Sequence, residues 1–88
     1  MPTILLVQGW RLFFYMNEGN EPMHVHPRKA ESECKFWLRS AYYEIEEDWS
    51  HNLTPRLRRE LRKIIFDHFD LLVGEWKRHI ERQRNAEN

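Results

Sequence analysis

The stretch "TPRLRRELRKIIFDHFDLLVGEWKRHIER", residues 54–82, repeats with the period of a helix, and it decides the class of the fold. Thr54 and Pro55 form a typical helix start, because the hydroxyl caps the first turn and Pro fits the first helical position. Apolar side chains then recur at about 100° per residue and form one stripe. They are Leu57, Leu61, Ile64, Ile65, Phe69, Leu72, Trp76 and Ile80. We therefore predict one long amphipathic helix over residues 54–83.

The length of this helix bears on assembly. At 1.5 Å per residue it would be roughly 40 Å long, whereas a five-residue strand spans roughly 17 Å. Its last turns would extend past a small sheet and leave Trp76 and Ile80 uncovered, which predicts a homodimer through this end. A break near Asp67 and His68 is the alternative to one continuous helix.

Residues 1–48 have a different period, an alternation of apolar and polar side chains that is typical of strands. The segments are "TILLVQ" (3–8), "WRLFFYM" (10–16), "MHVHPR" (23–28) and "CKFWLR" (34–39). They predict four short antiparallel strands, with a tight turn at Gln8 and Gly9 and a loop at "NEGNEP" (17–22). All the charged side chains of "YYEIEED" (42–48) are acidic, which predicts a fifth strand at an edge of the sheet.

The expected architecture is α+β, a small antiparallel sheet of four to five strands packed on one long C-terminal helix. At 88 residues, we expect a single domain covering residues 1–88, with 84–88 as a frayed tail. The lone Cys34 does not suggest a disulfide-stapled secreted domain. "MPTILLVQGW" is too short for a signal peptide or a membrane span, so we expect a cytoplasmic protein with no membrane contact.

Charge is balanced over the whole chain, with 14 Lys and Arg against 14 Asp and Glu. Its distribution is uneven, because residues 41–53 carry four acids and no Lys or Arg, whereas residues 54–84 are basic. The acidic block could lie against the basic helix, or each could face a different partner.

Strand alternation sorts the sheet into two faces. The face turned away from the helix should collect basic and aromatic side chains. They are Arg11, Phe13, Tyr15, His24, His26, Arg28, Lys35, Trp37 and Arg39. Such a set suits a protein interface, where aromatic residues and Arg are enriched. It also suits single-stranded nucleic acid, through stacking and phosphate contacts, or a plain solvated face.

His24 and His26 point the same way from one strand, so together they could hold one metal ion. Zinc requires a third and usually a fourth ligand, and the candidates His51, Cys34 and the acids of residues 44–48 lie at no recognisable ligand spacing. We therefore expect no metal and no cofactor, with the two histidines as surface groups for recognition. A histidine pair beside Arg and Tyr also resembles a metal-independent RNA-cleaving set. Cys34 is expected to be a core residue.

Several blocks of the chain resemble the bacterial domain of unknown function 4160 family. They are "MPTI", "GWRLFFYMNEGNEPMHVHPRK", "KFWL" and "IIFDHFDLLVGEW". The resemblance implies a short prokaryotic, cytoplasmic protein, encoded beside a second small family in an arrangement that suggests a toxin–antitoxin pair. It also implies His24 and His26 as functional positions, with Glu18 and Glu21 nearby. The chain differs at residues 40–53, which are more acidic here and lack a Gly near Asn52.

These observations lead to one functional expectation and two alternatives. We expect an intracellular protein-interaction module of a toxin–antitoxin-like pair, which binds a protein partner through the aromatic and basic sheet face. The first alternative is a small ribonuclease or RNA-binding protein that uses His24 and His26. The second is a metal-binding accessory protein.

Overall fold

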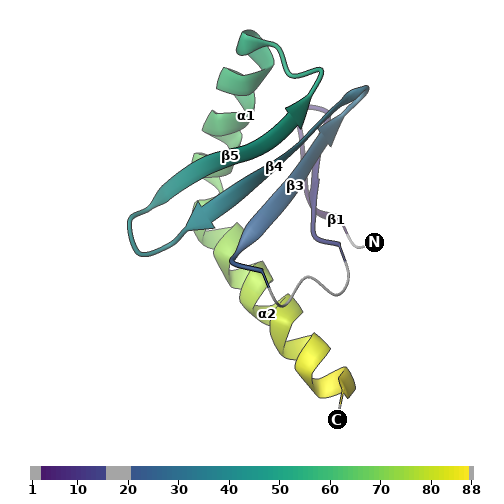
Figure 1. Cartoon of the computed structure of the whole chain (residues 1–88), viewed down its shortest axis with the longest axis vertical. Coiled ribbons are helices and arrows are strands. Elements are labelled where there is room, and N and C mark those ends of the chain that lie inside the picture. Colours follow the sequence, from purple (N-terminus) through teal and green to yellow (C-terminus); the bar gives the residue numbers. More distant parts are fainter. Residues whose placement is uncertain (1–2, 16–20, 88) are drawn as a thin grey trace.

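The computed structural model describes residues 3–15 and 21–87, and its architecture is the expected α+β (Figure 1). An antiparallel five-stranded sheet has the simple order β1-β2-β3-β4-β5. Its strands are β1 (Thr3–Val7), β2 (Trp10–Phe13), β3 (His24–Lys29), β4 (Ser32–Arg39) and β5 (Glu44–His51). Two helices follow, α1 (Pro55–Asp67) and α2 (Phe69–Glu87). The fifth strand is an edge strand, as its uniformly acidic side chains predicted.

Short turns whose residues have the left-handed backbone conformation, with positive φ, determine how the strands pair. Gln8 and Gly9 have φ of 53° and 83° and join β1 to β2, with Val7 opposite Trp10. Positive φ at both central residues gives the turn the twist that a two-residue hairpin requires. Asn52 also has a φ of 55°. Asn tolerates this left-handed region better than most residues.

The helical region begins as expected and is interrupted once. Thr54 is the N-cap, and its hydroxyl accepts a hydrogen bond from the Leu57 N–H at 3.2 Å. The helix does not continue unbroken to residue 83, because His68 leaves the helical conformation with φ −119° and ψ 22°. The His68 ring Nδ1 lies 2.9 Å from the Ile64 carbonyl oxygen, which also accepts a hydrogen bond from the His68 backbone N–H at 3.1 Å. The break near Asp67 and His68, the alternative expected from the sequence, is therefore the observed one.

The C-terminal helix extends beyond the sheet, as its length predicted (Figure 1). The side chain of Trp76, however, is only 6% exposed, and Ile80 is half-buried. The prediction that Trp76 lies uncovered is therefore wrong, because this residue packs inside its own chain. α2 continues past residue 83 to Glu87.

The core lies between the helices and one face of the sheet. Its members are buried apolar side chains from β2 to β5 and from both helices. They include Trp10, Leu12, Phe14, Val25, Cys34, Phe36, Leu38, Ile45, Leu61, Ile64, Ile65, Phe69, Leu72 and Trp76. Six of them alternate along the chain with residues expected on the other face: Leu12, Phe14, Val25, Cys34, Phe36 and Leu38. Burial raises the pKa of the Cys34 thiol to about 12, which agrees with the core role expected for it.

Two carboxylates, Glu60 and Glu47, connect α1 to the sheet through three polar contacts. Glu60 accepts a hydrogen bond from Trp10 Nε1 at 3.1 Å. It also forms an ion pair with Lys29, whose Nζ lies 2.9 Å from the carboxylate. Glu47 on β5 pairs with Arg58 on α1, with oxygen–nitrogen distances of 2.7 and 3.3 Å. The acidic block thus lies, at Glu47, against the basic helix.

A few expectations lie outside the described residues. They concern Glu18, the end of the second strand at Met16, most of the loop at 17–22 and the tail residue Asn88. Within the described residues, neither α1 nor α2 has the length and apolar content needed to cross a membrane.

Candidate functional site

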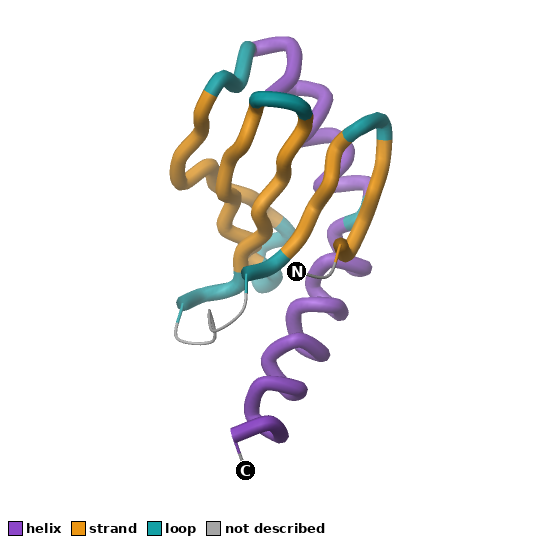
Figure 2. The backbone as a smooth tube through the Cα atoms, turned by 90° about the vertical axis from the view of Figure 1, so that its right-hand side faces the viewer, coloured by secondary structure: helices purple, strands orange, loops and turns teal. Residues whose placement is uncertain are grey.

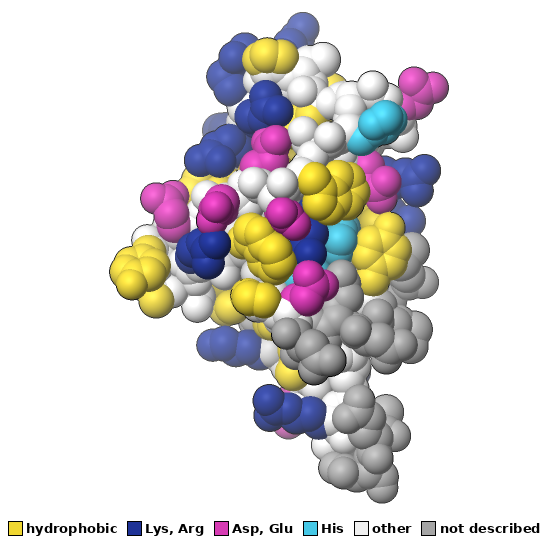
Figure 3. All heavy atoms as spheres, viewed as in Figure 1, with side chains coloured by type: hydrophobic (Ala, Val, Ile, Leu, Met, Phe, Trp, Pro, Cys, Tyr) yellow, Lys and Arg dark blue, Asp and Glu magenta, His cyan; other side chains and the backbone are white. Residues whose placement is uncertain are grey.

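The sequence predicted a set of residues on the sheet face away from the helices. The strand register places these residues side by side on neighbouring strands. Phe13 lies opposite His26, and His24 lies opposite Trp37. Arg11 lies opposite Arg28 on the same pair of strands as Phe13 and His26. We call this surface the histidine face. In Figure 3 hydrophobic, acidic and basic side chains interleave on the side of the molecule that carries β3, β4 and β5.

The two histidines are buried, not exposed. His24 is 0% and His26 is 4% exposed, and Phe13 and Lys35 on the same face are 1% and 7% exposed. The expectation that the histidines are surface groups is therefore wrong. Tyr15 and Trp37 are half-buried, and Arg28 and Arg39 are exposed, as a partly open face requires.

Aromatic rings account for this burial. The His26 ring centroid lies 4.5 Å from that of Tyr15 and 5.8 Å from that of Phe13. The His24 ring lies 5.0 Å from His26 and 5.5 Å from Trp37. Alternation shows which side chains share a face, but it does not show that large neighbours fold over the smaller ones.

The backbone fixes the orientation of the His24 ring. Nδ1 of His24 lies 2.8 Å from the carbonyl oxygen of Pro22. A carbonyl can only accept, so Nδ1 carries the proton and donates it. In the neutral ring Nε2 then holds the lone pair, and this nitrogen is also buried. Nε2 is therefore the nitrogen of His24 that could act as a base or a metal ligand.

Lys35 lies at the centre of the histidine face and is surrounded by carboxylates. Its Nζ lies 2.7 Å from Glu21 Oε1, 3.7 Å from Asp48 Oδ2 and 4.3 Å from the centroid of the Trp37 ring. The hydrogen bond from Lys35 lowers the pKa of the Glu21 carboxyl, and the nearby histidines act in the same direction. A buried ammonium needs such pairing, because an isolated charge there would be strongly destabilising.

Two of the other cations that the sequence placed on this face, Arg39 and Arg11, also have close partners. Arg39 pairs with Glu46 at 2.5 Å. Arg11 donates to the Thr3 hydroxyl at 2.7 Å and lies 4.9 Å from the centroid of the Phe13 ring. The face is thus mixed in charge, and the interpretation of it as basic is wrong. Sequence alternation lists the cations, but it does not show which acids reach them from neighbouring strands and loops.

Three residues of the site escaped the sequence analysis. Trp49 lies opposite Lys35 on β5, 6.4 Å from the His26 ring, and is 41% exposed. Glu33 accepts a hydrogen bond from the Tyr15 hydroxyl at 3.2 Å, and Asp48 reaches Lys35. Trp49 was missed because the fifth strand was expected to end at residue 48. An irregularity between Lys35 and Phe36 shifts the β4–β5 register, which hides the alternation there.

The histidine pair can contribute at most two ligands to a metal. Cys34 lies in the core on the opposite face, and His51 is exposed at the end of β5. Within residues 3–15 and 21–87, no three His, Cys, Asp or Glu side chains are grouped closely enough to hold an ion.

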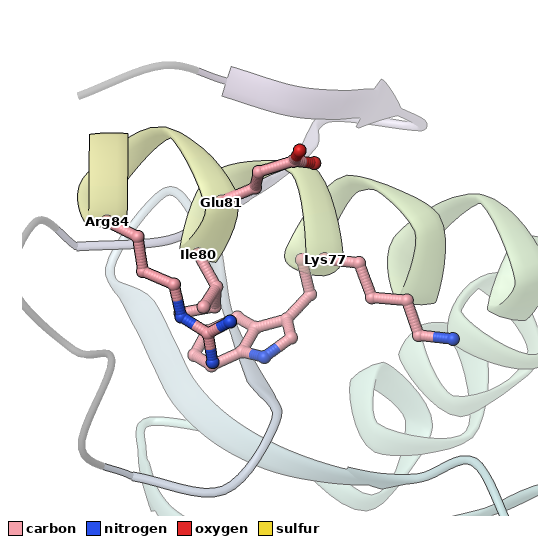
Figure 4. A pocket seen from close by; sticks show the side chains of 5 residues that line it. Lys77, Ile80, Glu81 and Arg84 are labelled. Atoms are coloured by element: carbon pink, nitrogen blue, oxygen red, sulfur yellow. The ribbon is translucent and has the colours of Figure 1, made fainter. Parts of the chain in front are cut away.

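A separate hollow lies at the end of the molecule. A pocket of about 380 Å³ is lined by the α2 residues Trp76, Lys77, Ile80, Glu81 and Arg84. In Figure 4 the side chains of Ile80 and Arg84 extend to one side of α2, whereas Lys77 and Glu81 point elsewhere. This pocket shares none of these lining residues with the histidine face.

Comparisons with known proteins give one match. The sequence model of a family described as "Domain of unknown function (DUF4160)" matches residues 9–77, which include β2 to β5, α1 and the first half of α2. No curated protein and no solved structure matches the chain.

Proposed function

We propose that this chain, which belongs to the DUF4160 family of domains of unknown function, is a small cytoplasmic protein-interaction module. Its partner would be a protein encoded by a neighbouring gene, so that the two form a bacterial toxin–antitoxin-like pair. The proposed contact surface is the histidine face, with its rim of aromatic side chains.

The observation that carries this proposal is the position of Trp49. Its side chain is 41% exposed, beside His26 and directly opposite the buried Lys35. A large aromatic ring that is partly open, on a rigid strand and next to a buried polar cluster, has the character of an interface hot spot. Half-buried Trp37 and Tyr15 extend the same surface.

The charges of the face favour a protein over a nucleic acid. Binding to a phosphate backbone depends on cations that neutralise phosphates. Here Lys35 pairs with Glu21 and Asp48, and Arg39 pairs with Glu46. A phosphate would have to displace these carboxylates, whereas a protein surface of mixed charge need not.

A co-purification experiment tests the proposal. The untagged chain is co-expressed with the tagged product of the neighbouring reading frame, and the affinity of the complex is measured by calorimetry. We expect Trp49→Ala to weaken binding by at least about 30-fold, the effect of a hot spot of about 2 kcal/mol. Leu71→Ala is the matched control, since Leu71 on α2 is also 41% exposed. Equal effects of the two changes, or no complex at all, would contradict the proposal.

Ribonuclease activity is a second candidate, favoured by the fixed ring of His24. The hydrogen bond to Pro22 leaves Nε2 as the basic nitrogen, and a catalytic histidine is commonly oriented through its other nitrogen in this way. The buried state of His24 and His26 weighs against it, because RNA must reach the ring. Cleavage of single-stranded RNA by the purified chain, lost in both His24→Gln and His26→Gln, would support it. Equal cleavage by the variants would assign the activity to a contaminant.

A further inference from the structure

The two edges of the sheet differ sharply in charge. β5, at one edge, carries Glu44, Glu46, Glu47 and Asp48, and its pairing with β4 contains an irregularity. Acidic side chains and bulges are devices that prevent an edge strand from pairing with another chain. β1, at the other edge, also has a register irregularity, between Thr3 and Leu5, but its sequence TILLV carries no charged residue. Figure 2 shows the β1–β2 hairpin at the margin of the sheet, with β1 outermost.

Leu6 is the residue of β1 most suited to an intermolecular contact. Its side chain is 71% exposed. Val7 and Trp10 close the two-residue turn, so they form a hydrogen-bonded pair. Because hydrogen-bonded and open positions alternate in antiparallel pairs, Leu6 directs its N–H and C=O away from β2. Both the side chain and the backbone of Leu6 are therefore presented at the edge.

We propose that β1 is a self-association edge, at which two copies of this chain pair antiparallel around a two-fold axis near Leu6. In this arrangement each Leu6 N–H donates to the Leu6 carbonyl of the second copy. The two Leu6 side chains then lie on the same face, with their Cα atoms about 5.5 Å apart. The result is a continuous ten-stranded sheet with an acidic β5 at each end.

Charge and symmetry select a second copy as the occupant. An uncharged strand meets itself without repulsion, whereas β5 against β5 would place acids opposite acids. Pairing of β1 with β5 of another copy would be head-to-tail and would propagate, and the acids of β5 oppose it. The β1–β1 pairing closes on itself. It does not depend on the proposed protein partner.

The dimer is expected to be weak. A contact made by one short strand per copy falls below the roughly 1,200 Å² at which stable specific interfaces begin. It should therefore dissociate on dilution within the micromolar range. This interface also differs from the one expected from the sequence at Trp76 and Ile80, of which Trp76 is buried within the chain.

Light scattering over a dilution series tests the proposal. We expect the untagged chain to be dimeric at high concentration and monomeric when diluted. Leu6→Lys should raise the dissociation constant at least about ten-fold, because it removes an apolar contact and sets two like charges opposite each other. Leu71→Lys is the control, since Leu71 is an exposed leucine on α2 and should leave dimerisation unchanged. A chain that stays monomeric throughout, or a Leu6→Lys variant that dimerises normally, would overturn the proposal.

Hydrogen exchange gives a second and direct readout. The Leu6 amide should exchange fast in the dilute monomer and become protected as concentration rises, since in this arrangement the Leu6 carbonyl of a second copy accepts its hydrogen bond. The Val7 amide, directed at β2, should be protected at both concentrations. Protection of Leu6 that does not change with concentration would show that the edge is covered within one chain and would refute the dimer.

Discussion

The ring centroids of His24 and Trp76 lie 4.8 Å apart, and this contact joins the start of β3 to α2. Trp76 also meets Phe14 at 5.2 Å on the core side, while His24 meets His26 at 5.0 Å on the histidine face. A series of ring contacts thus passes from the core, around the end of the sheet, to the candidate site. The site is therefore not an independent surface feature, because its histidines depend on the packing of the core.

This contact makes Trp76 a stability residue. We expect Trp76→Ala to destabilise the chain by about 3–5 kcal/mol, because it opens a cavity beside Phe14 and His24. The denaturant midpoint of unfolding measures the effect. Lys77→Ala, at the neighbouring exposed position, should cost far less. A midpoint near that of the unmodified chain, with loss only of self-association, would favour the uncovered Trp76 that the sequence suggested.

The two faces of β4 should differ in their tolerance of truncation. Phe36 is 0% exposed and lies in the core, whereas Trp37 is half-buried on the histidine face. Phe36→Ala should therefore cost about 3–5 kcal/mol and Trp37→Ala clearly less, since the second site is open to solvent. Urea midpoints of the two variants give the comparison. The reverse order would mean that Trp37, not Phe36, fills the core.

Much of this fold could be predicted from local patterns. The two-residue period of "CKFWLR", the turn at Gln8 and Gly9 and the cap at Thr54 each indicate a structure that one short segment determines. The break at His68 could only be offered as an alternative, because the apolar stripe keeps its phase across it. α1 ends at the local conformation of His68, whose ring lies against the Ile64 carbonyl. A periodic pattern of apolar residues cannot predict such a contact.

Which side chains share the histidine face could be predicted from the sequence. Their burial and their charged partners could not. Alternation correctly placed Phe13 with His26 and His24 with Trp37. It could not show that Tyr15 and Trp49 flank His26, or that Glu21 reaches Lys35. Burial and charge pairing depend on side chains from different strands and loops, so they appear only when the chain is folded.

Cys34 should be inert in the folded chain. Its side chain is 0% exposed, and burial raises the pKa of the thiol to about 12, so almost no thiolate is present at neutral pH. A thiol reagent at pH 8 should react with the native chain only as fast as the chain unfolds, and at once in denaturant. Rapid modification of the native protein would contradict the buried position.

Stability should decrease in acid partly through Glu47. The hydrogen bonds from Arg58 lower the pKa of this carboxyl from its ordinary value of 4.5. A lowered folded-state pKa contributes stability that is present above the unfolded value and is lost as pH falls through the folded value. The urea concentration at the midpoint of unfolding of the unmodified chain should therefore decrease as the pH is lowered below about 4.5. Glu47→Gln should reduce stability at pH 7 and flatten this pH dependence. Arg58→Gln should have the same effect, and a profile as steep as that of the unmodified chain in either variant would exclude the pair as a cause.

The last prediction concerns what His24 contributes to the fold. The sequence predicted His24 as a surface group, whereas the structure buries it against Trp37 and Trp76. We expect His24→Ala to cost about 2–4 kcal/mol, from the cavity and from the lost hydrogen bond to Pro22. His24→Asn can return an N–H donor to the position of Nδ1 without restoring the ring, so it should recover about 1 kcal/mol of this loss. Denaturant midpoints of the two variants separate the contributions of ring packing and hydrogen bonding. If both variants unfold at the midpoint of the unmodified chain, the rings around His24 contribute nothing to stability, and the histidine face would be free to serve binding alone.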